Sequence, residues 1–383
     1  MSNLLQFFSG QVAQIALLWL ITELTTSRTL LGTVGLAQGL TVFLASPAAG
    51  VAADRLPKRR LLAISRLSLA LLPASVALLV FSERIEVWHV VVFSVLGGMV
   101  MALMQPASQT YVYDVVGRKR VQNAIALNAT GTGAAQMGGP ALAGGLIALV
   151  GTAATFGFSA LGMAFSGLIL VLIPVSGGTG AGTRRSVLAD LREGFRYVAD
   201  SPPLRIAFLI CCLSIFNGAL GVMRPIFARH VLEVGSQGYG LMAGAAGVGT
   251  VLGGVVTAVL PPMKRPGLVL AGSMLAFALS IALYSLAFSF SYILVVELLM
   301  GISGQVWGVA TYSGLQMSVP EDMRGRVMGM VFMVVQLGSI GQLLIGLLAD
   351  AVGDQLALGI FGLIPTVCIA LLFAFGYRSL REL

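Results

Sequence analysis

Few residues that could carry charge or a proton lie inside the apolar segments of this chain. Glu297 falls within one such segment, Arg224 near the end of another, and Glu23 close to the end of the first. A carboxyl group can carry a proton when its surroundings alternately favour and disfavour its charge. We therefore predict that Glu297, responding to Arg224, and Glu23 are proton-coupling residues. A permanently closed structural ion pair would produce the same sequence.

Neutral polar side chains recur near the middle of the apolar segments. Such groups avoid lipid, so each one either lines an internal cavity or bonds a neighbouring helix, and we expect the second role for about half of the glutamines. Amides beside an aromatic ring suit an amphipathic organic solute better than a small ion or a phosphorylated sugar. The predicted cavity residues are Gln14, Gln105, Gln136, Asn217, Gln305, Trp307 and Gln336.

Long apolar helices are needed to position these side chains. Hydrophobic residues make up 57% of the 383 residues and charged residues 10%, whereas a soluble domain carries about 25% charged residues. Apolar runs of about 20 residues, enough to cross a ~30 Å hydrocarbon core, recur along the whole chain. We predict an all-α membrane protein with twelve transmembrane helices, at 4–24, 30–53, 61–81, 87–113, 122–148, 153–174, 204–229, 236–260, 267–288, 291–318, 327–349 and 355–377.

The position of the basic residues sets the expected topology. The net charge is +8, but eighteen of the 23 Lys and Arg residues lie at the helix ends and linkers of one side, rather than in a patch suited to nucleic acid. Basic loops stay in the cytoplasm, so both termini and the middle linker are expected there. The three cysteines lie within apolar segments without metal-site or disulfide spacing. We expect no metal and no cofactor.

The chain divides into two similar halves. We predict a six-helix bundle over 1–175, a cytoplasmic linker with an amphipathic helix over 176–203, and a second six-helix bundle over 204–383. The repeat is visible in Asp114–Val121 and Pro320–Val327, which follow the fourth and tenth helices and precede glycine-rich helices. Duplicated halves are typical of secondary transporters, whose solute site lies near the midplane.

A glycine, an acid and a basic cluster follow one another at the cytoplasmic end of the second helix. The segment reads Gly50-Val-Ala-Ala-Asp54-Arg55-Leu-Pro-Lys58-Arg59-Arg60. The glycine permits close helix approach, and a carboxylate at the membrane edge can bind a neighbouring helix N-terminus or an arginine. Such contacts can exist only while the cytoplasmic side is closed, and Asp114, at the end of the fourth helix, is the expected acidic partner of the basic cluster. The alternative is a set of charges that only fixes topology.

This segment resembles the signature loop of the major facilitator superfamily, although Pro57 stands where a glycine is common. The resemblance implies a conformational latch formed by Gly50, Asp54, Arg55, Lys58, Arg59 and Asp114. Gly138–Gly145 is similar to the glycine-proline motif of antiporter branches, which implies a kinked gate helix built on Gly139, Pro140 and Gly144. Ordinary packing by small residues is the alternative. Further stretches, such as Met323–Gly329, resemble the bacterial branch that contains the enterobactin exporter and macrolide efflux proteins. The resemblance covers the whole chain.

The resemblance implies a monomeric secondary active exporter in the bacterial inner membrane, driven by the proton gradient. Its expected partners are the lipid bilayer and a small amphipathic organic substrate of the drug, macrolide or siderophore type. The alternatives are a lysophospholipid or other lipid carrier of the same fold, and a membrane receptor or scaffold without transport. No phosphate-binding Gly-x-x-x-x-Gly-Lys-Ser/Thr loop is present, which argues against an ATP-driven pump, and no catalytic constellation suggests an enzyme.

Overall fold

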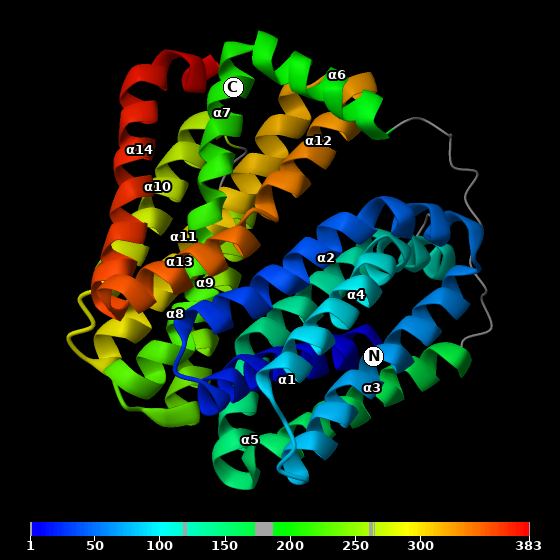
Figure 1. Ribbon diagram of the computed structural model, residues 1–383. Helices are drawn as coiled ribbons and strands as arrows, with labels where there is room; N and C mark the ends of the chain where they lie inside the picture. The colour runs from blue at the N-terminus through cyan, green and yellow to red at the C-terminus, as the bar shows by residue number, and fades with distance from the viewer. Residues whose placement is uncertain (1, 118–120, 173–186, 260–262, 264, 383) are drawn as a thin grey trace. The chain divides into compact units, whose positions relative to one another are not determined.

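The computed structural model describes residues 2–117, 121–172, 187–259, 263 and 265–382. Every regular element within these residues is helical (Figure 1). The elements up to residue 172 are α1 (Ser2–Leu24), α2 (Arg28–Arg55), α3 (Lys58–Phe81), α4 (Val87–Val116) and α5 (Val121–Leu172). The later elements are α6 (Val187–Asp200), α7 (Pro202–Cys212), η1 (Leu213–Gly218), α8 (Ala219–Ile226), η2 (Phe227–Val231), α9 (Gly235–Val259), α10 (Pro266–Tyr284), α11 (Phe290–Ser318), α12 (Glu321–Val335), α13 (Gly338–Val352) and α14 (Asp354–Glu382).

Eleven segments of the described residues are long and apolar enough to cross a membrane. One of them, Leu127–Leu172, contains 46 residues and is long enough for two crossings at ~1.5 Å per residue. Gly151 interrupts it with a φ of 83°, a conformation that glycine adopts without the steric penalty of a side chain. The long element α5 therefore consists of two helices that meet at Gly151, in line with the predicted helices 122–148 and 153–174. The expected all-α membrane fold is confirmed.

The chain forms two compact units. Unit 1 contains residues 1–26, 33–183 and 233–244, and unit 2 contains residues 27–32, 184–232 and 245–383. The beginning of α2 therefore packs in unit 2, and the beginning of α9 packs in unit 1.

In unit 1, α5 packs along α1 and α3. Small residues allow these approaches: a Cβ added to Gly139 would lie 2.7 Å from the Cβ of Gln11 on α1. The ring of Trp19 stacks on that of Tyr239, with centroids 6.0 Å apart. In lipid, the hydrophobic effect does not favour association between apolar helices. Close packing and polar contacts between helices therefore stabilise unit 1.

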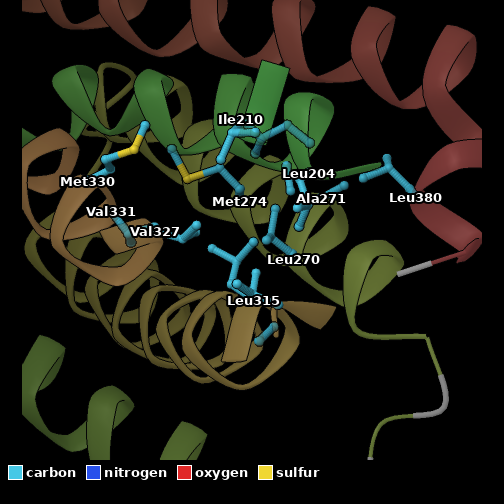
Figure 2. Packing of buried hydrophobic residues seen from close by; sticks show 14 of the residues in the cluster. Leu204, Ile210, Leu270, Ala271, Met274, Leu315, Val327, Met330, Val331 and Leu380 are labelled. Carbon is cyan, nitrogen blue, oxygen red and sulfur yellow. The ribbon is translucent and has the colours of Figure 1, made fainter. Parts of the chain in front are cut away.

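The core of unit 2 lies between α7, α10, α11, α12 and α14 (Figure 2). Ile210, Leu270 and Met274 point toward one another there, and Leu315 and Val331 belong to the same cluster. The linker helix α6 packs on α12, where Glu193 accepts a 2.8 Å hydrogen bond from Arg326.

Two of the predicted helices are interrupted. The segment predicted as 204–229 consists of α7, the 3-10 turn η1, α8 and the π turn η2, and the segment predicted as 327–349 breaks at Gln336 and Leu337 between α12 and α13. The first turns of α13, just after the break, pack on η1, where a Cβ on Gly341 would lie 2.8 Å from the Ile215 carbonyl carbon. Such local departures from α geometry are frequent at functional sites.

Candidate functional site

A cavity of about 370 Å³ lies inside unit 1 among α1 to α5. This volume falls within the usual range of organic-ligand sites, about 300–1,000 Å³. Amides line it at Gln6, Gln11, Gln14, Gln38 and Gln136. Its apolar lining includes Phe7, Phe93, Met101, Met104, Phe156 and Met163. The lining can therefore both hydrogen-bond and enclose an amphipathic molecule.

The first helix supplies most of the amide groups because Gln6, Gln11 and Gln14 lie within about two turns of the helix. Gln6 is only 6% exposed, and its Oε1 has no hydrogen-bond partner among the described residues. A buried amide without a partner is costly to the fold. Gln6 thus has hydrogen-bonding capacity that a ligand in the cavity can use.

Of the predicted cavity residues, Gln14 and Gln136 are brought together in this cavity. Gln105 belongs to α4, but its side chain lies outside the described residues. Gln6, Gln11 and Gln38 also line the cavity and were not predicted from the sequence. Helical spacing from Gln14 back along the first helix is a signal that could have found the first two.

The other predicted cavity residues belong to unit 2. Asn217 lies in η1 and Trp307 on α11; the Asn217 Oδ1 and the Trp307 Nε1 are buried without a hydrogen-bond partner among the described residues. Gln305 packs beside α9, since a Cβ on Gly253 would lie 3.0 Å from its Cβ. Gln336 lies at the break between α12 and α13, where its carbonyl oxygen accepts a 2.8 Å bond from Ser339.

The predicted partners Glu297 and Arg224 form a bidentate ion pair in unit 2. Nε of Arg224 donates to Oε1 of Glu297 at 2.5 Å, and its Nη2 donates to Oε2 at 2.8 Å. Glu297, on α11, is fully buried, while the side chain of Arg224, on α8, is 19% exposed. Bidentate hydrogen bonds between a guanidinium and a carboxylate are strong and directional.

Glu23 lies at the other end of α1 from Ser2 and is exposed. It accepts hydrogen bonds from Nε1 of Trp19 at 2.7 Å and from Oγ1 of Thr152 at 3.1 Å. These contacts join α1 to the segment after Gly151 within unit 1.

The predicted latch falls largely outside the described part of the chain. The structure describes only the backbones of Gly50, Asp54, Arg55 and Asp114, which belong to α2 and α4. Lys58 and Arg59 begin α3.

The glycine-proline segment packs tightly on two sides. Gly139 faces α1, and a Cβ on Gly144 would lie 2.9 Å from the Cα of Gly240 at the beginning of α9. Pro140 lies within α5, and its carbonyl oxygen lies 2.5 Å from the position of a Cβ on Gly240.

One charged cluster was not predicted from the sequence. Asp350, near the end of α13, accepts bonds from the backbone N–H groups of Arg28 and Thr29 at 3.0 and 2.9 Å, and from Oγ of Ser27 at 3.1 Å. Arg28 donates two 2.9 Å bonds to Asp354. The Asp350 carboxylate thereby caps the first turn of α2, whose N–H groups have no partner within the helix.

Comparison with known proteins agrees with this architecture. A bacterial homologue of the lysosomal transporter Spinster has a TM-score of 0.74 at 15% identity and covers 100% of this chain and 96% of its own. The nucleoside transporter NupG has a TM-score of 0.76 at 13% identity, over 97% of this chain and 98% of its own. The chain therefore shares the fold of these two proteins.

The sequence comparison narrows the class. The family model described as "Transmembrane secretion effector" matches residues 1–382, and the chain belongs to this family of the major facilitator superfamily. The Staphyloferrin A transporter of Staphylococcus aureus is 25% identical over 99% of this chain and 96% of its own. The multidrug efflux pump Tap of Mycolicibacterium fortuitum is 28% identical over 88% and 85%, and the enterobactin exporter EntS of Shigella dysenteriae 27% over 91% and 85%.

Proposed function

We propose that the chain exports amphipathic organic molecules across the bacterial inner membrane, with both termini in the cytoplasm, by proton antiport. The observation that carries the proposal is the amide- and aromatic-lined cavity of unit 1, about 370 Å³ in volume. The names of the relatives support export, because two of them are an exporter and an efflux pump.

Proton antiport needs a carboxyl group that exchanges its proton during the cycle, and Glu297 is the proposed group. It is buried against Arg224, so protonation would release the guanidinium from its counter-charge and favour a different arrangement of α8 and α11. Glu23 stays a second proposed site. Alternating access then proceeds through the latch around Asp54 and Asp114 and the closely packed helix of Gly139, Pro140 and Gly144.

Accumulation of a solute panel in an efflux-deficient bacterium tests the proposal. Cells that express the protein should accumulate less of at least one dye, macrolide or siderophore than vector cells, because outward transport opposes entry. An uncoupler that collapses the proton gradient should remove the difference. Equal accumulation of every solute in both strains, with the protein present in the membrane, would contradict the proposal.

A further inference from the structure

A buried arginine lies next to the cavity of unit 1 and has no role in the proposed cycle. Arg66, on α3, is 2% exposed. It donates hydrogen bonds to the Oγ atoms of Ser2 and Ser166, the latter at 2.7 Å, and to Oδ1 of Asn3 at 2.5 Å. Its Nε has no partner among the described residues.

All of these acceptors are neutral, so no described carboxylate contacts the guanidinium. None of the ion pairs among the described residues involves Arg66. A charge that is held away from water, with no counter-ion among the described residues, is screened much less than an exposed charge and therefore acts over a longer distance.

The cavity begins one helical turn above this charge. Ser2 and Asn3 bind Arg66, and Gln6 is the first cavity residue of α1. The described lining contains no Asp, Glu, Lys or Arg residue. Glu23, the acid of α1, is exposed and lies roughly 25 Å further along the helix from Gln6. Solvent therefore screens the charge of Glu23 more strongly than the charge of Arg66.

From this arrangement we infer that the cavity is electropositive and admits amphipathic solutes that are neutral or anionic while excluding lipophilic cations. Arg66 determines this selectivity through its field, without lining the cavity. The inference rests on the proposed function and names the charge class of its solutes. A unit charge roughly 10 Å away, at an effective dielectric constant of about 20, changes the affinity for a charged ligand on the order of tenfold.

Three probes on one scaffold test the inference: a dansyl amide whose alkyl tail ends in a methyl, a carboxylate or a trimethylammonium group. Binding to the purified full-length protein is followed by fluorescence titration. The carboxylate probe should bind at least about tenfold more tightly than the trimethylammonium probe. Arg66→Gln should bring the two affinities close together, and Arg66→Lys should restore the difference.

Two further variants separate the field of Arg66 from other effects. Arg84→Gln removes the same charge from an exposed loop of unit 1 and should leave the preference unchanged. Gln14→Glu keeps Arg66 but adds a carboxylate to the cavity lining, and it should raise the relative affinity for the trimethylammonium probe even if Arg66→Gln fails to fold.

The outcomes distinguish this inference from the proposed function. A wild-type preference for the trimethylammonium probe, equal affinities for the charged probes, or no saturable binding of any probe would overturn the inference. Efflux that is retained in cells but favours lipophilic cations would leave the exporter intact and refute the charge selectivity. Selective binding without efflux in cells would support the charge selectivity and contradict the exporter.

Discussion

Glu297 and Arg224 form the most deeply buried ion pair recorded among the described side chains, with Glu297 fully inaccessible to solvent. Charges in such a setting are retained at a cost, since burying an ion pair gains little over apolar packing and breaking one leaves a charge without compensation. A buried pair in a membrane helix bundle is for this reason a sign of function. An ion pair that only stabilises the fold would have the same geometry. Removal of both charges distinguishes this structural role from a role in proton coupling.

Glu297→Gln should lower stability on the order of 3 kcal/mol, because it leaves Arg224 without its counter-charge, and should reduce gradient-driven efflux to the level of the vector. The double variant Arg224→Gln/Glu297→Gln should recover the stability, because neither charge of the pair is left without the other. Thermal unfolding of the purified variants and efflux in cells measure the two effects.

The double variant decides between the roles. If Glu297 carries the proton, the double variant folds but remains unable to use the gradient. Recovery of gradient-driven efflux together with stability would show that the pair is only structural. Glu83→Gln, a change to an exposed carboxylate, is the matched control and should alter neither quantity.

Close helix crossings at glycine are the main feature at the scale of the element. The crossing of α5 and the beginning of α9 lies at Gly144 and Gly240, within unit 1. Gly145, the next residue along, has no atom within 4 Å of an added Cβ. These neighbours therefore separate the effect of packing from the effect of glycine on helix propensity.

Gly144→Ala should destabilise the protein by about 1–3 kcal/mol, because the new methyl group would force α5 away from α9. Gly145→Ala should be neutral or slightly stabilising, since alanine favours a helix over glycine by about 1 kcal/mol. Thermal unfolding in the same detergent compares the pair. Equal melting temperatures for the two variants would contradict the close crossing.

The helices were predicted well from the sequence because each one must bury its backbone polar groups within a long apolar run. The interruptions in α7 to η2 and at Gln336 were not predicted, because the close approach of Ile215 and Gly341 is a tertiary contact. The cap that Asp350 places on α2 was missed for the same reason: the two segments lie more than 300 residues apart. Local sequence carries no information about either partner.

At the scale of the whole molecule, the predicted cavity residues are divided between the two units. Gln14 and Gln136 line the cavity of unit 1, whereas Trp307, the predicted aromatic residue, lies in unit 2. The cavity itself depends on which faces of five helices point inward, and so Gln6, Gln11 and Gln38 emerged only from the structure. The duplicated halves indicated a transporter, and the family match confirms that class.

Transport by purified protein in liposomes shows whether proton movement drives the movement of solute. A solute found in the cell panel is placed at equal concentration on both sides of the membrane, a pH gradient is imposed, and the internal solute and internal pH are recorded together. With proton antiport, the solute accumulates on the more acidic side, as protons leave that side through the protein. Solute that stays evenly distributed whether or not the gradient is present, or that moves equally in protein-free liposomes, would contradict it.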